Sequence, residues 1–180
     1  TSSHERGQVY VPAVNWMFES APIPGFNGRT NYFPRGKILG GSSSINGLVV
    51  SRGNAGDYDT WARLGNAGWG WDDCLPYFKK IENYPAGDPR HRGHDGPIGV
   101  TATPLESMNP TSRAFIEGGR QAGYPFNPDM NEGNPYGMAQ MQGNYADGER
   151  HSASARYLRP ALHRPNLTVV TGALVGRVIL

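Results

Sequence analysis

The sequence contains little cysteine and no long apolar run. Its single cysteine, Cys74, excludes an internal disulfide and any metal site built from cysteines. No segment approaches the roughly 20 apolar residues of a membrane-spanning helix, so no membrane span is predicted. Neither sign of charge is in large excess, because 17 basic residues are balanced by 15 acidic residues and the net charge is only +2. This balance argues against a nucleic-acid partner or an anionic membrane surface.

Several short motifs of enzyme chemistry are absent as well. The sequence has no Gly-x-Gly-x-x-Gly for a dinucleotide, no His-Glu-x-x-His for zinc, no Gly-x-Ser-x-Gly for a serine nucleophile and no Gly-Lys-Ser/Thr for a nucleotide triphosphate. His151 and His163 lie at the ends of a predicted helix, where an imidazole more often interacts with the helix terminus than acts in catalysis. We therefore predict no catalytic residue and no metal ligand in this chain. This applies to all five histidines of the sequence, His4, His91, His94, His151 and His163.

What the sequence does contain is glycine, 25 residues in all, with a concentrated run at residues 34–47. The run reads Pro-Arg-Gly-Lys-Ile-Leu-Gly-Gly-Ser-Ser-Ser-Ile-Asn-Gly. Glycines let the backbone approach a ligand closely, and successive N–H groups before a helix start form a pocket for phosphate or other polar cofactor atoms. A Gly/Ser run can also be a flexible loop, and composition alone leaves that alternative open.

The residues that follow favour the ligand-binding interpretation. The run continues through Val50, Arg52-Gly53 and Asp57-Tyr58-Asp59-Thr60-Trp61. The whole resembles the first signature of the glucose–methanol–choline (GMC) family of FAD-dependent oxidoreductases. In that signature a Gly-Gly-Ser-Ser turn leads through Asn to an aromatic residue, then Arg-Gly, then an acidic helix. Val50 departs from the pattern, since relatives usually carry an aromatic residue there. Further resemblances follow in the family's order at residues 68–80, 92–98, 148–158 and 164–169.

This resemblance implies a fold, a cofactor and an activity. The fold would be α/β (mixed α+β), a partial FAD-binding Rossmann-like domain with inserted loop-rich and substrate-domain segments. The whole protein would oxidise the CH–OH group of a primary alcohol to an aldehyde with hydride transfer to flavin, and its catalytic His would lie outside this chain. The electron acceptor stays open. Two alternatives also stay open: a hydroxynitrile-lyase-type member with structural FAD, and a non-redox phosphate-binding module.

The resemblance also implies which residues line the FAD. Members that attach the flavin covalently have His where Ile45 stands, so a non-covalent FAD is implied. Ser42 matches a position near the diphosphate, and Val175 matches the residue whose main chain meets the adenine. The implied cofactor-binding residues are Ile38, Gly40, Gly41, Ser42, Asn46, Gly47, Leu48, Val49 and Val175.

Residue patterns predict the elements of secondary structure. The apolar residues 45–50 indicate a helix start or a buried turn, and Pro76 is expected only in the first turn of its helix. The aromatic loop at residues 124–145 fits either a lid over a substrate cavity or a cap on the scaffold. We expect strands at residues 16–19 and near 98–101, helices at 57–64, 72–82, 112–121 (with Ser112 as cap) and 152–162, and β-rich runs at 167–171 and 174–180.

The predicted organisation has three parts. Residues 1–111 form an FAD-binding region with the signature loop 34–61, residues 112–162 a loop-rich and helical excursion toward the substrate domain, and residues 163–180 return strands of the FAD-binding domain. Because the dinucleotide motif and the family's C-terminal His are missing, we expect an internal fragment that is inactive alone. The expected partner of the whole protein is a small-molecule alcohol. Its cellular location stays open, with the cytoplasm favoured.

Overall fold

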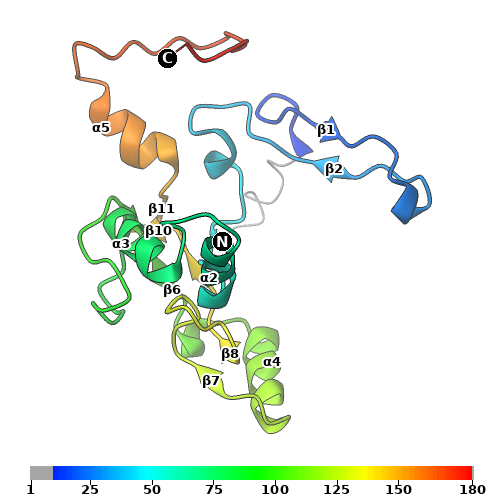
Figure 1. The fold of residues 1–180 in the computed structure, drawn as a ribbon, viewed down its shortest axis with the longest axis vertical. Helices are drawn as coiled ribbons and strands as arrows, with labels where there is room; N and C mark the ends of the chain where they lie inside the picture. The colour runs from blue at the N-terminus through cyan, green and yellow to red at the C-terminus, as the bar shows by residue number, and fades with distance from the viewer. Residues whose placement is uncertain (1–9, 180) are drawn as a thin grey trace.

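Helices and strands are mixed along the chain, as predicted, in the computed structural model, which describes residues 10–179. Short strands lie near the middle of the molecule together with helices α2 (Ala55–Arg63) and α3 (Trp71–Ile81) (Figure 1). Three projections extend from this centre: an N-terminal hairpin, a unit around helix α4 (Pro110–Gln121), and the C-terminal helix α5 (Arg159–Ala161) with the chain beyond it.

The N-terminal projection is an antiparallel hairpin of β1 (Phe18–Glu19) and β2 (Tyr32–Phe33), joined through the short 3-10 helix η2 (Pro24–Phe26). Strand β1 lies within the strand predicted at residues 16–19. The buried Asn15 anchors the base of the hairpin, because its Oδ1 accepts the N–H of Arg35 at 2.9 Å. This contact fixes the chain where it enters the Gly/Ser run.

The central sheet has three short antiparallel strands in the order β3 (Val49–Val50), β9 (Gln142–Gly143), β6 (Thr101–Ala102). It places the end of the Gly/Ser run beside a segment nearly 100 residues later in the sequence. Ile45 and Leu48 are buried just before β3 while Asn46 and Val49 are exposed, so residues 45–50 form a half-buried turn that ends in a strand. The turn alternative for these residues is therefore confirmed, and the helix alternative is wrong.

Two further strand pairs flank this sheet. Strand β4 (Glu82–Asn83) runs parallel to β5 (Ile98–Gly99), at the position where a strand was predicted near residues 98–101. Strand β10 (Tyr145–Ala146) pairs antiparallel with β11 (Glu149–Arg150). Arg150, the last residue of this second hairpin, contacts the Gly/Ser run.

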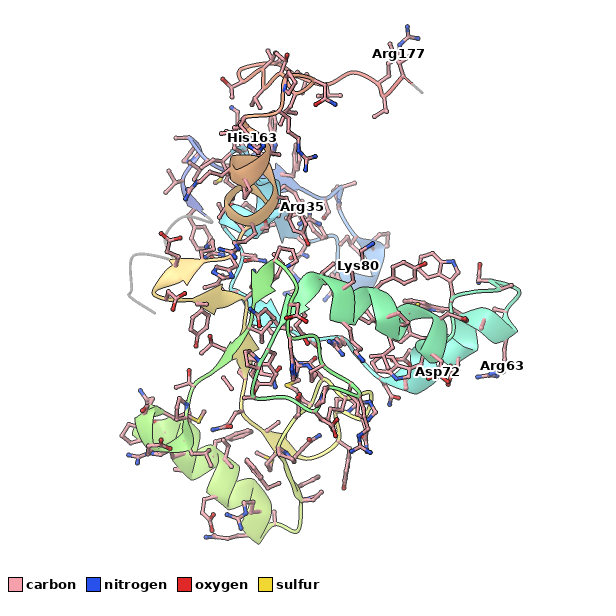
Figure 2. All side chains as sticks on the ribbon, turned by 90° about the vertical axis from the view of Figure 1, so that its left-hand side faces the viewer. Arg35, Arg63, Asp72, Lys80, His163 and Arg177 are labelled. Atoms are coloured by element: carbon pink, nitrogen blue, oxygen red, sulfur yellow. The ribbon has the colours of Figure 1, made fainter. Side chains whose placement is uncertain are left out.

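Helices α2 and α3 are joined by aromatic side chains. Tyr58 of α2 meets Trp71 and Phe78 of α3 edge-on, with ring centroids 5.4 and 5.8 Å apart. Asn54 caps α2 by accepting the N–H of Gly56, so the helix starts before the predicted residue 57. Pro76 lies in the interior of α3, so the expectation that it would occupy the first turn is wrong. The charged side chains Arg63, Asp72 and Lys80 extend outward from these two helices (Figure 2).

Helix α4 begins earlier than predicted. Asn109, not Ser112, is its N-cap, because the Asn109 Oδ1 accepts the N–H of Thr111 at 2.8 Å and Pro110 occupies the first helical position. The helix follows the 3-10 turn η4 (Leu105–Ser107) and packs on β8 (Met138–Ala139), which runs parallel to β7 (Phe126–Asn127). Part of the 124–145 loop is thus ordered against α4.

The C-terminal part combines a confirmed helix with two strand predictions that are wrong. A π-helical segment, η5 (Ser154–Leu158), continues into α5, within the helix predicted at residues 152–162. Residues 167–179 form no strand, and Leu180 lies outside the described residues. Val170 and Val175 are 72% and 77% exposed, and Arg177 lies at the far end of this chain (Figure 2). Strand propensity alone does not order a segment that has no neighbouring strand to pair with.

Few apolar side chains are fully buried in the described residues. The core consists of Ile45, Leu48, Trp71, Val100 and Ile116, while many large apolar side chains are exposed. None of the helices between residues 10 and 179 combines the length and the apolar character that crossing a membrane requires.

A buried polar network takes the place of a larger apolar core. Arg92, whose side chain is fully buried, binds both carboxylate oxygens of Glu82 at 2.8 Å and also binds Asp129. Glu82 accepts a second guanidinium, that of Arg52, at 2.7 Å. Two cations and two carboxylates balance one another, which buried charges require. The network joins Arg52, Glu82, Arg92, Asp129, Asn131 and Gln142.

Candidate functional site

The Gly/Ser turn depends on two left-handed glycines. Gly40 and Gly41 have φ angles of 88° and 56°, a conformation that residues with side chains rarely adopt. A Cβ on Gly40 would lie 2.9 Å from the Cβ of Ser154 and would collide with the Ser44 hydroxyl. A Cβ on Gly41 would meet no atom within 4 Å. Gly40 is therefore required by both backbone and packing, whereas Gly41 is required by its backbone and faces open space.

The serine hydroxyls of the turn largely serve the turn itself. Ser43 donates to the Gly40 carbonyl at 2.6 Å, and Ser44 donates to the Leu39 carbonyl at 2.8 Å, within and before the 3-10 helix η3 (Gly41–Ser44). Ser42 instead accepts the N–H of Gly36 at 3.1 Å. Its own proton remains available to a ligand, so Ser42 is the serine of the three that suits a polar cofactor atom.

The exit from the turn is held in a strained conformation. Leu48 has a φ of 64°, although left-handed backbone disfavours a residue with a branched apolar side chain. Its N–H donates to Asn46 Oδ1 at 3.2 Å, its carbonyl accepts the N–H of Asn144 at 2.9 Å, and its side chain is buried. Such strain persists only where surrounding contacts determine the conformation, and it is commonly found at ligand sites.

Several positions of the turn present bare backbone or exposed apolar side chains. Gly47, like Gly41, has no atom within 4 Å of the position a Cβ would take. Ile38 is 47% exposed and Val49 is 54% exposed, while Ile45 points into the core. This surface can receive an amphipathic ligand that needs close backbone approach, apolar contact and a few polar partners.

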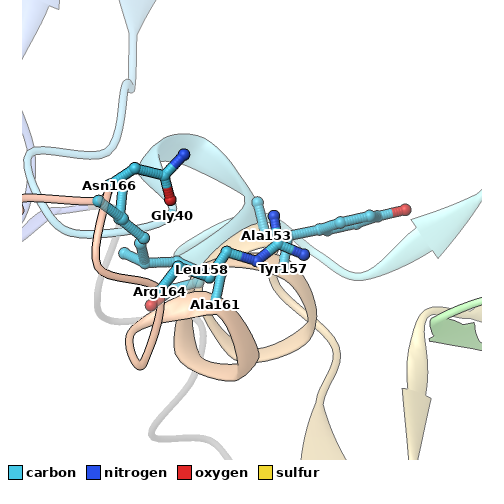
Figure 3. Close-up of a pocket in the computed structure, with 9 residues that line it drawn as sticks. Gly40, Ala153, Tyr157, Leu158, Ala161, Arg164 and Asn166 are labelled. Atoms are coloured by element: carbon cyan, nitrogen blue, oxygen red, sulfur yellow. The ribbon is translucent and has the colours of Figure 1, made fainter.

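A cavity of about 460 Å³ opens beside Gly40 (Figure 3). It lies between the turn and the C-terminal helical segment, and Arg164 supplies its one cationic side chain among the lining residues. Apart from Gly40, the sequence did not single out these residues as a site, because those at 153–161 have the pattern of an ordinary helix. The cavity is lined by Gly40, Ala153, Ser154, Tyr157, Leu158, Ala161, Arg164, Asn166 and Leu167.

Eight of the nine implied cofactor residues lie in one short, continuous segment of the chain. Ile38, Gly40, Gly41, Ser42, Asn46, Gly47, Leu48 and Val49 all lie between the hairpin β1–β2 and the start of β3. Val175 does not join them, because it lies in the exposed chain after α5 that has no strand. The implied site at residues 38–49 is thus one continuous segment of the chain, and Val175 is not part of it.

Two histidines of the described residues, His151 and His94, have hydrogen-bond partners within the fold. His151 is buried, and its Nδ1 accepts the N–H of Gly99 at 2.7 Å, so this nitrogen is deprotonated. Burial lowers the pKa of His151 below its usual value, and the Arg156 cation lowers it further. His94 Nε2 bonds the Gly87 carbonyl at 3.0 Å. Within residues 10–179 no group of histidine, cysteine and carboxylate side chains could hold a metal ion.

Sequence reasoning missed one side chain that contacts the turn. The guanidinium of Arg150 donates to Asn46 Oδ1 at 2.7 Å and to the Ser43 carbonyl at 3.3 Å. The only signal in the sequence was its place in the Gly148-Glu149-Arg150 landmark, which gave no indication of a contact with residues more than 100 positions away.

The comparisons with known proteins identify relatives over nearly the whole chain. A family model described as GMC oxidoreductase matches residues 6–180. The chain is 44% identical over 165 residues to the oxygen-dependent choline dehydrogenase of Photobacterium profundum, covering 92% of this chain and 29% of that protein. It is 42% identical over 165 residues to the mitochondrial choline dehydrogenase of Mus musculus, covering 92% and 27%. The chain thus spans less than a third of the length of these curated relatives.

A solved structure shows the same fold. The pyridoxine 4-oxidase of Mesorbium loti superposes with a TM-score of 0.83 at 31% identity, covering 96% of this chain and 35% of that one. Proteins of the GMC oxidoreductase family are FAD-dependent enzymes, and the matched N-terminal region is their FAD-binding part. On the family match and these identities, this chain belongs to the GMC oxidoreductase family of FAD-dependent enzymes.

Proposed function

We propose that the whole protein oxidises a primary alcohol to an aldehyde with non-covalently bound FAD. Family membership and relatives named choline dehydrogenase support this reaction class, and they favour it over a non-redox phosphate-binding module. The observation that carries the proposal is the turn at residues 38–49. Its two open glycines, Gly41 and Gly47, expose backbone in front of which no side chain of the described residues stands.

The chemistry of this surface fits FAD. Exposed Ile38 and Val49 suit the apolar part of a flavin, and the Asn46 carboxamide suits its polar edge. The Ser42 hydroxyl, which still has a proton to donate, suits a phosphate oxygen. Ile45 is buried and has no group that could bond the flavin, so attachment here would be non-covalent. When bound, FAD supplies the acceptor for the hydride that leaves the alcohol carbon.

The part played by this chain is binding and orientation. The left-handed glycines and the buried Leu48 hold the backbone of the turn in one conformation. The acceptor nitrogen of His151 is already bonded to Gly99, so this imidazole is committed to the fold. We assign the base that removes the hydroxyl proton to a residue outside this chain, as the family resemblance implies.

The test uses the full-length protein, with choline as the first alcohol offered because two relatives bear its name. We expect the purified protein to carry FAD, to form aldehyde, and to release its FAD on acid or heat denaturation. Turnover is measured with oxygen and with an artificial electron acceptor, which distinguishes an oxidase from a dehydrogenase. Bound FAD without oxidation of any primary alcohol would contradict the proposal and indicate a lyase-type member. Yellow colour remaining with the precipitate would contradict non-covalent attachment.

A further inference from the structure

We propose that Arg150 is a positioning residue for the cofactor: it orients the Asn46 carboxamide so that the NH2 group faces the FAD. The inference rests on the proposed function, since it takes residues 38–49 as the FAD site. It assigns a role to a side chain that is distant in sequence from the turn and that the turn's own motif does not contain.

The orientation of the Asn46 amide follows from its partners. Two groups face the same atom of this amide: the Leu48 N–H at 3.2 Å and the Arg150 Nη1 at 2.7 Å. Both groups can only donate, so the atom they face must be the carbonyl oxygen. The choice between oxygen and nitrogen in an Asn side chain is usually ambiguous, but here the donors settle it. The NH2 group is therefore on the opposite side.

That NH2 group is available to a ligand. The Asn46 side chain is exposed, and within residues 10–179 no acceptor is hydrogen-bonded to its Nδ2. The next residue on the chain is Gly47, with no atom near its missing Cβ, and Val49, three residues after Asn46, is 54% exposed. The turn thus offers an N–H donor beside bare backbone and an apolar side chain. A flavin, with carbonyl and ring-nitrogen acceptors and an apolar edge, has the complementary chemistry.

Arg150 is held firmly where it can do this. It ends the hairpin β10–β11, whose two turn residues, Asp147 and Gly148, have φ angles of 52° and 77°. Asp-Gly with both residues left-handed is the favoured two-residue hairpin turn, and it matches the twist of the strands. The carbonyl of Asn144, just before the hairpin, accepts the His151 N–H at 3.0 Å. Asn144 also donates its N–H to the Leu48 carbonyl. The hairpin is therefore joined to the turn at Leu48, whose own N–H binds the Asn46 amide.

The same segment holds the first half of the turn. Arg150 donates to the Ser43 carbonyl at 3.3 Å, and the Ala153 N–H donates to the Ser43 hydroxyl at 2.9 Å. One guanidinium therefore contacts the turn on both sides of Ile45. Loss of this guanidinium would leave only the longer Leu48 N–H bond of 3.2 Å to orient the Asn46 amide. The amide could then rotate and present its oxygen, which cannot donate to a flavin acceptor.

The test is a double-mutant cycle in the full-length protein. The variants are R150M, N46A and R150M/N46A, with R150K as the conservative replacement. R156M is the matched control, because the Arg156 Nε also donates to a backbone carbonyl, that of Pro97 at 2.6 Å, but does not contact the turn. The measurements are the FAD dissociation constant of the reconstituted apoprotein, the absorbance spectrum of the bound flavin and the thermal midpoint of the apoprotein.

We expect R150M to weaken FAD binding by up to about tenfold, the scale of one hydrogen bond lost between the Asn46 NH2 group and the flavin. R150K should restore part of the affinity, and R156M should bind FAD as the wild type does. Because Arg150 acts through Asn46, adding R150M to N46A should change the affinity less than about twofold. A role in folding alone would instead lower the apoprotein's thermal midpoint and leave the FAD affinity of the folded protein unchanged.

Two results would overturn the inference. One is R150M with the FAD affinity of R156M, and the other is an R150M effect that adds in full to that of N46A. In either case a wild-type protein that binds FAD leaves the proposed function standing. A wild-type protein that does not bind FAD at all would overturn both proposals, so the two failures are distinguishable.

Discussion

At the scale of single residues, Gly41 and Gly28 share a backbone requirement and differ in their proposed surroundings. Their φ angles are 56° and 73°, and neither would place a Cβ within 4 Å of another atom. In the FAD-free protein G41A and G28A should therefore each cost about 1 kcal/mol of stability. With FAD at the turn, the methyl group of G41A meets the cofactor. We expect G41A alone to lower FAD affinity, by about tenfold or more, in an FAD titration.

A control glycine for G41A must have open space around its missing Cβ. Gly87, in the loop between β4 and β5, is unsuitable, because a Cβ there would lie 2.5 Å from the Cγ of Arg92 and 2.8 Å from the Tyr84 ring. A substitution at Gly87 would disturb the buried network and change stability for an unrelated reason. Equal FAD affinity in G41A and G28A would show that the turn is an ordinary surface loop.

His151 gives the fold a dependence on pH with a definite sign. Burial, with a further contribution from the Arg156 cation, lowers its pKa in the folded protein below the value of about 6.5 that it has when unfolded. As the pH falls, the unfolded chain protonates this imidazole before the folded protein does. The stability that the neutral, buried His151 contributes is therefore present above pH 6.5 and is lost as the pH falls through the lowered pKa.

The measurement compares the thermal midpoint of the wild type with that of H151N from pH 7.5 to 5. We expect the wild type to lose more stability than the variant over this range, because only the wild type must protonate a buried imidazole. Parallel decreases would show that the pH dependence arises elsewhere. The Nδ1 of His151 accepts the N–H of Gly99 in β5 at 2.7 Å. Protonation of this nitrogen therefore also breaks a hydrogen bond between β5 and the residue that follows β11.

At the scale of elements, Arg92 connects segments that would otherwise be weakly joined. It links Glu82 at the end of α3 with Asp129 and Gln142 in the 124–145 segment. Burial lowers the pKa of Arg92, but its bonds to Glu82 and Asp129 outweigh burial and the net pKa is raised, so Arg92 remains a cation. Removing one member of a buried charge network leaves the other charges unpaired.

We therefore expect R92M to destabilise the full-length protein by about 3–5 kcal/mol. Arg90 is the control, because it lies two residues away and its ion pair with Asp88 is on the surface, with 80% of the Arg90 side chain exposed. R90M should leave the chemical denaturation midpoint close to that of the wild type. If the two variants have the same midpoint, the network contributes no more than a surface ion pair.

The elements also show what a sequence can predict. The existence of helices α2, α3 and α4 could be predicted from the sequence, but the capping residues of α2 and α4 were assigned too late in the chain. The special turn at residues 34–47 follows from its glycines. The network around Arg92 could not be predicted, because its members come from four separate segments. Each member, considered alone, would be expected to be an exposed polar residue. The strands predicted after residue 166 failed for a related reason, since pairing depends on a partner strand and not on propensity. The boundaries at residues 111 and 162 stay a prediction.

At the scale of the whole molecule, the chain exposes more surface than a compact protein of its size. Its accessible area is 12619 Å², whereas a folded monomer of 19.6 kDa is expected to expose about 8,600 Å². Much of the excess is apolar, including Phe115, Val170, Leu174 and Val178, each more than 70% exposed. Exposed apolar surface of this extent marks contacts with further polypeptide. The relatives, more than three times longer than the matched segment, contain such polypeptide.

The purified 180-residue chain should consequently be inactive and prone to associate. We expect no steady FAD-dependent oxidation of a primary alcohol, because the described histidines include no free base at the turn and the cofactor surface at residues 38–49 lies open to water. Dye binding to exposed apolar surface and size-exclusion chromatography should reveal association that the full-length protein lacks. Sustained alcohol oxidation by the isolated chain would show that the base and the remainder of the FAD site are contained within these residues, and would require a different assignment of the chemistry.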